Sequence, residues 1–120
     1  MAEINKYRKT NMLRFLQINL GKSKTAQDLL FQTARERHVD VLLVSEQHDI
    51  DEISYYQDST RRAGIILLNP ILRVSKFKST NQGFVWVDID NFRIYSCYFS
   101  PNETIDKFRK QIDELDASMI

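Results

Sequence analysis

Cysteine, glycine and proline are scarce in this sequence of 120 residues, which contains one, three and two of them. A single cysteine, Cys97, cannot form an internal disulfide bond, which argues against a small secreted domain held together by disulfides. Few glycines and prolines, together with an ordinary 42% of hydrophobic residues, exclude a fibrous or disordered chain. The composition therefore predicts one folded domain at most, in the reducing interior of a cell.

Long hydrophobic runs and a strong net charge are also absent. No stretch approaches the roughly 18 continuous apolar residues of a membrane span, and the first residues are charged where a signal peptide has its apolar core. The net charge is +1, from 17 Lys and Arg against 16 Asp and Glu. A nucleic-acid-binding domain typically shows a basic stripe or a pI above about 9, so the charge balance alone does not indicate one.

The first half of the chain predicts a βαβ unit. Residues 1–11 have no periodicity and predict a flexible tail. In residues 12–20 apolar side chains occur on both faces of the predicted strand, which is typical of a central strand between two layers. Residues 23–37 repeat apolar positions at helical spacing, with Ser23 or Thr25 as the N-cap, and residues 39–45 form a second strand. A strand, a helix and a strand in succession predict two parallel strands.

The second half predicts antiparallel strands and a closing helix. Residues 49–59 are polar and predict a loop, whereas residues 63–69, 73–78, 83–89 and 92–99 predict strands. The last two are joined by a short hairpin turn, and residues 104–119 predict a helix. The fold class is therefore α+β, with a mixed, mostly antiparallel sheet that starts with the βαβ unit and has helices on one face. Phe84 and Trp86 share a strand face that no predicted element covers.

Two polar residues follow the two parallel strands. Asn19 ends the first strand and Glu46 comes directly after the second. The carboxyl ends of parallel strands lie at one edge of a sheet, which is where open α/β sheets place their sites. Taken alone, Glu46 would be a solvated strand end and Asn19 a turn residue before the helix.

Four short runs, in order, resemble the exonuclease–endonuclease–phosphatase superfamily. They are L-R-F-L-Q-I-N-L from residue 13, V-L-L-V-S-E-Q from residue 41, G-I-I-L-L from residue 64 and Y-S-C-Y-F-S-P-N from residue 95. The runs A-Q-D-L-L from residue 26 and Y-Q-D-S-T-R-R-A-G from residue 56 are more narrowly similar to the apurinic-site-like endonuclease domain of non-long-terminal-repeat retrotransposons. The resemblance covers residues 12–120 and implies the N-terminal half of a four-layer sandwich, in which two sheets are flanked by helices.

The resemblance implies an activity and its partners. The family hydrolyses phosphodiesters with Mg²⁺ or Mn²⁺, and its retrotransposon branch nicks chromosomal DNA so that the new 3′ hydroxyl primes reverse transcription. We therefore expect double-stranded DNA as the partner, a reverse transcriptase in the parent protein and action in the nucleus, with no role for a membrane.

The resemblance also assigns roles to four residues. Glu46 matches the metal-binding glutamate, and Asn19 matches the asparagine beside the metal and the phosphate. Tyr98 matches the tyrosine that binds the scissile phosphate, and Asn102 matches the asparagine after the Y-x-x-P turn. Considered without the resemblance, Tyr98 is a core aromatic and Asn102 a helix cap or turn residue.

Two segments of the family pattern do not occur in this sequence. The G-D-F-N-like and S-D-H-like segments carry the residues that orient and activate the attacking water, and the only histidines here are His38 and His48. We therefore expect a truncated endonuclease domain that lacks its C-terminal half and is inactive alone. Two alternatives are a non-catalytic remnant that binds nucleic acid or protein through the uncovered face, and a phosphatase acting on lipids or nucleotides.

Two smaller questions stay open on the sequence. His48 could contact a metal or a phosphate, or be an exposed loop histidine. Tyr55 and Tyr56, with Arg61 and Arg62, could stack on and pair with DNA, or form an ordinary surface loop.

Overall fold

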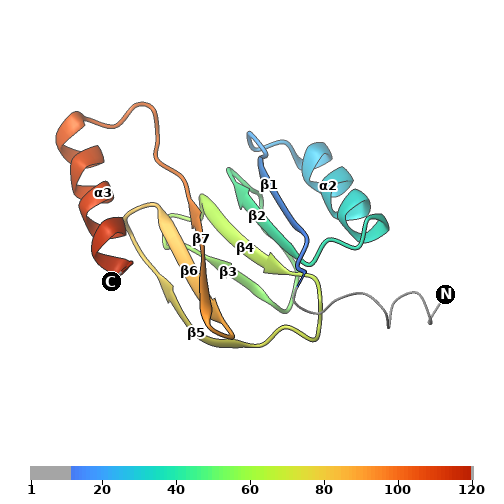
Figure 1. Cartoon of the computed structure of the whole chain (residues 1–120). Coiled ribbons are helices and arrows are strands. Elements are labelled where there is room, and N and C mark those ends of the chain that lie inside the picture. Colours follow the sequence, from blue (N-terminus) through green and yellow to red (C-terminus); the bar gives the residue numbers. More distant parts are fainter. Residues whose placement is uncertain (1–11, 120) are drawn as a thin grey trace.

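The computed structural model describes residues 12–119; residues 1–11, for which a tail is predicted, and Ile120 lie outside the described residues. The described chain forms two sheets and two helices (Figure 1). In chain order the elements are β1 (Phe15–Asn19), α2 (Lys24–Glu36), β2 (Val41–Ser45), β3 (Tyr55–Gln57), β4 (Ala63–Leu67), β5 (Val74–Ser79), β6 (Phe84–Ile89), β7 (Phe92–Cys97) and α3 (Ile105–Ser118).

The strands form two sheets, as the family resemblance implies, whereas periodicity alone predicts a single mixed sheet. The first sheet has the order β1-β2-β4-β3 and the second has the order β5-β6-β7. β1 and β2 are parallel, which confirms the βαβ unit, and the other pairs are antiparallel. The chain changes sheets in a turn at Asn69, whose side chain accepts a hydrogen bond from the Ile71 N–H at 2.9 Å. Periodicity within a strand does not reveal such a change of sheet.

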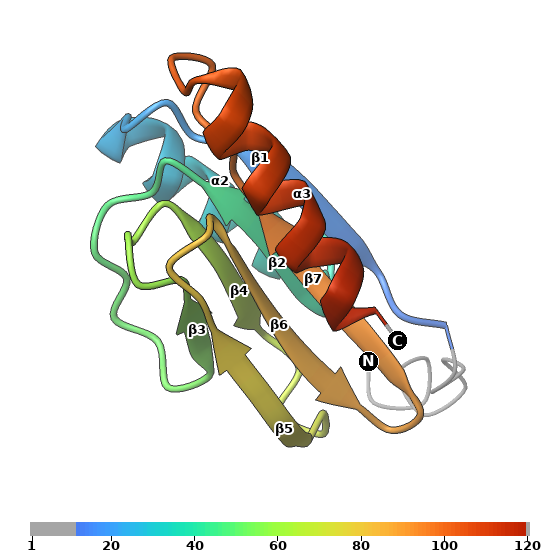
Figure 2. The ribbon, with the colours of Figure 1, turned by 90° about the vertical axis from the view of Figure 1, so that its left-hand side faces the viewer.

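The elements stack in four layers, with α2 outside the first sheet and α3 outside the second (Figures 1 and 2). The α+β class is confirmed, but the helices cover the outer faces of two sheets and not one face of one sheet. Alternating side chains of both sheets form the core between them: Val41, Ile65, Leu67, Val85, Val87, Ile89 and Ile94. A second core lies between α2 and the first sheet: Leu20, Leu30, Ala34, Leu42, Val44 and Ile66.

Helix α2 begins where a serine caps it. Ser23 is the N-cap and accepts a hydrogen bond from the Ala26 N–H at 3.1 Å, so Ser23, and not Thr25, fills this position. The apolar stripe predicted for this helix supplies Leu30 and Ala34 to the core against the first sheet. Because α2 connects β1 to β2, this packing fixes where both strands end.

The segment predicted as a loop contains the short strand β3, which pairs with β4 at the margin of the first sheet. Tyr56 packs against the core between the sheets, with its ring centroid 5.0 Å from that of Phe77. The polar residues around it hide this strand from the sequence pattern, since three residues are too few to show an alternation.

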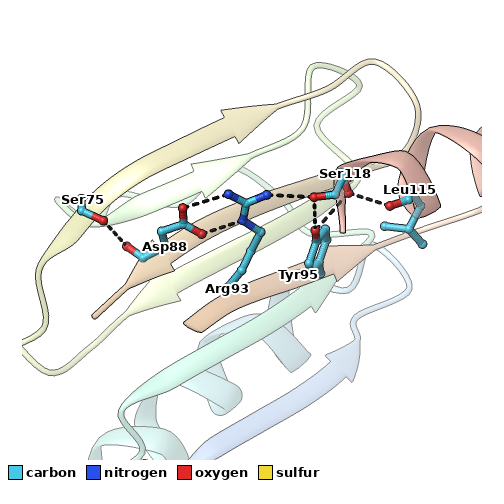
Figure 3. Close-up of polar contacts among 6 residues, drawn as sticks. All are labelled: Ser75, Asp88, Arg93, Tyr95, Leu115 and Ser118. Atoms are coloured by element: carbon cyan, nitrogen blue, oxygen red, sulfur yellow. Dashed lines mark hydrogen bonds and ion pairs between the residues drawn. The ribbon is translucent and has the colours of Figure 1, made fainter. Parts of the chain in front are cut away.

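The face that carries Phe84 and Trp86 is covered, contrary to the prediction from the sequence. Phe84 is 2% exposed and Trp86 is 6% exposed. The Arg93 guanidinium lies 3.5 Å from the centre of the Trp86 ring, binds both carboxylate oxygens of Asp88 and donates to the Ser118 carbonyl at the end of α3 (Figure 3). Helix α3 and the Arg93 guanidinium thus supply the missing cover.

β1 is the outermost strand of the first sheet and not the predicted central strand. Phe15 remains 46% exposed and Ile18 39% exposed. Phe15 pairs with Val41 and therefore points toward the second sheet. It remains exposed because the strands of the second sheet lie over β2, β3 and β4 and not over β1. None of the helices in residues 12–119 is long and apolar enough to cross a membrane.

Candidate functional site

Three polar side chains from distant parts of the sequence meet at one rim of the two sheets. Asn19 ends β1, Glu46 follows β2 and Tyr98 follows β7. The Asn19 Nδ2 atom donates a hydrogen bond to Glu46 Oε1 at 3.2 Å. A side-chain hydrogen bond to Glu46 is the first cause that raises the pKa of Tyr98. Both sheets therefore contribute to one site, with Glu46 at its centre.

The backbone of Glu46 is held in an uncommon conformation. Its φ of 52° lies in the left-handed region, which costs a non-glycine residue about 1–2 kcal/mol. Two hydrogen bonds offset this cost: the Glu46 N–H donates to the Arg62 carbonyl, and the Glu46 carbonyl accepts from the Lys22 N–H, each at 2.8 Å. Strained residues that the surrounding structure holds in place are concentrated at functional sites.

Asn19 orients the carboxylate of Glu46. The Asn19 side-chain oxygen accepts a hydrogen bond from the Gly21 N–H at 2.8 Å, which leaves its amide group to donate to Glu46. Gly21 has a φ of 58°, a conformation that glycine adopts without steric cost. The turn after β1 thus fixes the orientation of the Asn19 amide, because the Asn19 oxygen already accepts the hydrogen bond from Gly21.

Gln27, which was not among the predicted functional residues, anchors the loop that follows Glu46. Its side chain is 2% exposed, donates to the Asp49 carbonyl at 3.1 Å and accepts from the His48 N–H at 2.8 Å. The sequence could have indicated Gln27, because it lies one turn before Leu30 on the buried stripe of α2. A buried amide needs hydrogen-bond partners, so Gln27 was a candidate to bind a neighbouring loop.

His48 is an exposed residue beside the same turn. Its Nε2 atom lies 2.5 Å from the Lys22 carbonyl, so this nitrogen serves as the donor in that contact. The ring is thereby held against the turn after β1, and the choice between a ligand and a plain loop histidine stays open.

Asn102 follows Tyr98 by four residues and makes no hydrogen bond to the other three site residues within the described part of the chain. It is exposed in the turn after Pro101, and its N–H donates to the Ser100 side chain at 3.3 Å.

The two tyrosines considered for DNA stacking are engaged within the fold. The Tyr55 hydroxyl accepts from Gln47 at 2.9 Å and donates to Gln57 at 2.7 Å, while Tyr56 packs on Phe77. Burial raises the pKa of Tyr55. These contacts favour a structural role for both rings. Of the group considered for DNA binding, Arg61 and Arg62 are then the remaining candidates.

The pKa of Tyr98 is raised above its ordinary value of about 10, first by its hydrogen bond to Glu46 and then by burial. The charge of Arg62 acts in the opposite direction and lowers this pKa. Tyr98 is therefore a protonated phenol at neutral pH, with a hydrogen to donate to an anionic oxygen.

The donors at this rim fit a cation that keeps most of its water. Mg²⁺ takes six oxygen ligands and typically binds through one or two carboxylates while retaining several waters. Glu46 supplies one carboxylate, and within the described residues no group of three or more His, Cys, Asp or Glu side chains is placed to hold a metal ion. The rim thus has the donors for one side of such an ion.

No family model matches the sequence, and a search of curated proteins gives no match. Among solved structures, the chain is similar to the endonuclease domain of TRAS1, a telomere-specific non-LTR retrotransposon, with a TM-score of 0.76 and 26% sequence identity. The match covers 91% of this chain and 54% of that chain. The chain therefore has the α+β fold of about half of a retrotransposon endonuclease domain, as the sequence resemblance implies.

Proposed function

We propose that this chain is part of a metal-dependent endonuclease domain that hydrolyses phosphodiesters in double-stranded DNA. The observation that supports it is the meeting of Asn19, Glu46 and Tyr98 at one rim, where β1, β2 and β7 end. A carboxylate, an amide and a phenol suit a divalent cation next to a phosphate.

Each of the three side chains has a separate task in this proposal. Glu46 holds Mg²⁺ or Mn²⁺, which would neutralise charge on the phosphate when bound. Asn19 fixes the direction of the Glu46 carboxylate. The Tyr98 hydroxyl leaves Glu46 and donates to a non-bridging phosphate oxygen, because a phosphate oxygen gathers charge during hydrolysis. Asn102, in the turn that follows Tyr98, is the fourth residue that the resemblance assigns, and its contacts give it no separate task here.

The proposed activity requires groups beyond this set. A general base that activates water contributes roughly 10² to 10⁴ in rate, and neither Asn19 nor Tyr98 can serve as one at neutral pH. The chain spans 54% of the TRAS1 endonuclease chain, so we propose that a complementary C-terminal half supplies the base. In the parent protein, that domain would act with a reverse transcriptase on chromosomal DNA in the nucleus.

The first test is metal binding by the chain as it stands. Electron paramagnetic resonance of free Mn²⁺ should show weak binding to the wild type, and Glu46→Gln should weaken it at least tenfold because the charged ligand is lost. Glu36→Gln is the matched control, since Glu36 is an exposed glutamate at the end of α2 whose side chain accepts a hydrogen bond from Gln32. Equal Mn²⁺ affinity in the wild type and Glu46→Gln would contradict the proposal.

The second test is nicking of supercoiled plasmid in Mg²⁺. The chain alone should nick slowly or not at all, and any activity should disappear in Glu46→Gln. Vigorous nicking that survives this substitution would place the chemistry elsewhere in the chain.

A second candidate function is a non-catalytic remnant that binds protein or nucleic acid. The face with Phe84 and Trp86 does not support it, because both are buried. The exposed edge strand β1, with Phe15 on one face and Ile18 on the other, offers a different site for association. A chain that binds a partner through β1 and does not bind Mn²⁺ at Glu46 would favour this alternative.

A further inference from the structure

We propose that Arg62 binds a phosphate of the DNA backbone at the rim that holds Glu46 and Tyr98. This inference rests on the proposed function, because it takes DNA as the ligand. It adds a cation to a set that otherwise contains a carboxylate, an amide and a phenol. Four features of the structure support it: the position of Arg62, its rigid support, its charge and the absence of a carboxylate at ion-pair distance among residues 12–119.

The sheet places Arg62 directly across from Glu46. The antiparallel pairing of β2 with β4 reaches Ser45 and Ala63, so the next positions across the sheet are Glu46 and Arg62. The Glu46 N–H donates to the Arg62 carbonyl at 2.8 Å and extends the ladder by one bond. Neighbours across two strands lie close enough for their side chains to act on the same ligand.

A buried carboxylate holds the turn that presents Arg62. Asp58 is 1% exposed, and one of its oxygens accepts from the N–H groups of Arg62 and Ala63, each at 2.9 Å. Its second oxygen accepts from the N–H and the hydroxyl of Thr60. The left-handed conformation of Arg61, with a φ of 63°, completes this turn. A backbone fixed in this way reduces the entropy that ligand binding would cost.

Arg62 brings a positive charge to the rim, because its backbone lies across the sheet from Glu46. A phosphate that binds both groups would receive a hydrogen bond from Tyr98 and a charged pair from Arg62. Arginine suits this role because its planar fork can donate two parallel hydrogen bonds to a phosphate.

The two adjacent arginines differ in their partners. Arg61 forms an ion pair with Asp49, whereas within residues 12–119 no carboxylate lies at ion-pair distance from Arg62. Both side chains are exposed. A DNA phosphate would have to displace Asp49 from Arg61, but it would find Arg62 free. This contrast makes Arg61 a matched control for its neighbour.

The test is the affinity for a fluorescent DNA duplex, measured by anisotropy between 50 and 200 mM salt with Ca²⁺ in place of Mg²⁺. Arg62→Gln should weaken binding several-fold at low salt and reduce the slope of log affinity against log salt by about 0.9, the value for one lost phosphate contact. Arg61→Gln should change both quantities by less than half as much. Arg62→Lys should restore the slope but not the full affinity, because it keeps the charge and loses the fork.

Unchanged affinity and slope in Arg62→Gln, equal losses in the two glutamine variants, or no duplex binding by the wild type would overturn the role of Arg62. Circular dichroism of both variants excludes unfolding as the cause of a loss. Mn²⁺ binding at Glu46 is measured separately, so the metal proposal can stand while the Arg62 role fails, and the reverse also holds.

Discussion

At the scale of single residues, the centre of the candidate site is a strained glutamate with a fixed amide on one side and a phenol on the other. Glu46 keeps its left-handed backbone because neighbouring turns bind its N–H and its carbonyl. Asn19 donates to its carboxylate, and the carboxylate in turn raises the pKa of Tyr98. The ionisation of Tyr98 therefore reports on whether these groups are together in solution.

We predict that Glu46→Gln lowers the pKa of Tyr98 toward its ordinary value of about 10. The raised pKa in the wild type arises first from the hydrogen bond to the Glu46 carboxylate. Because the folded pKa is above the unfolded one, this contact stabilises the fold fully below pH 10, and the stabilisation is lost as the pH rises through the folded pKa. Glu46→Gln should reduce that loss at alkaline pH.

The measurement is a pH titration by NMR of protein labelled with ¹³C at the tyrosine Cζ. Tyr98→Phe identifies the signal of Tyr98 among the five tyrosines. A Tyr98 pKa that is the same in the wild type and in Glu46→Gln would show that the two side chains are apart in solution.

At the scale of elements, helix α2 determines where the site-bearing strands end. Its apolar stripe is packed on the first sheet, and its N-cap at Ser23 lies two residues after Gly21, in the turn that orients Asn19. Gln27 of the same helix binds the loop after Glu46. A change in the packing of α2 should therefore affect the stability of the domain and the site together.

Two adjacent leucines of α2 test this packing. Leu30 is 6% exposed and belongs to the core, whereas Leu29 is 60% exposed. Leu30→Ala should lower the free energy of unfolding by about 2–5 kcal/mol through lost burial and a cavity. Leu29→Ala should change it by no more than about 0.5 kcal/mol, as is usual for a surface position. Urea denaturation followed by circular dichroism measures both, and similar losses in the two variants would contradict this orientation of the helix.

At the scale of the whole molecule, the two sheets do not end together. Strands of the second sheet lie over β2, β3 and β4, whereas β1 extends past them as the outermost strand of the first sheet. β1 and β7, the free margins that lead to Asn19 and Tyr98, lie on the same side of the molecule (Figure 2). An exposed edge strand with apolar side chains is a surface on which another chain can pair.

We predict that this edge makes the isolated chain associate with itself as its concentration rises. Phe15→Lys should lower the average mass measured by light scattering at high concentration, because a charged edge strand resists pairing. Ile53→Lys is the control, since Ile53 is fully exposed in the turn before β3, at the opposite end of the first sheet from β1. A constant monomer mass in the wild type, or an equal effect of the two substitutions, would refute the role of β1.

Local sequence patterns were enough to predict the α+β class, the parallel βαβ unit, most strand positions and both helices. These properties follow from local periodicity and from capping, which act within a few residues of the chain. The resemblance also led to Glu46, Asn19 and Tyr98, because each follows a strand end within a recognisable run.

The resemblance implied two sheets flanked by helices, but contacts in the folded chain were needed to assign each strand to its sheet and to show what covers it. The change of sheet after β4, the short strand β3, the cover over Trp86 and the exposure of β1 all depend on contacts between distant segments. The same holds for Gln27 and Arg62, which reach the site from α2 and from the turn before β4. Periodicity shows which face of an element is apolar, but the packing of other elements decides whether that face is buried.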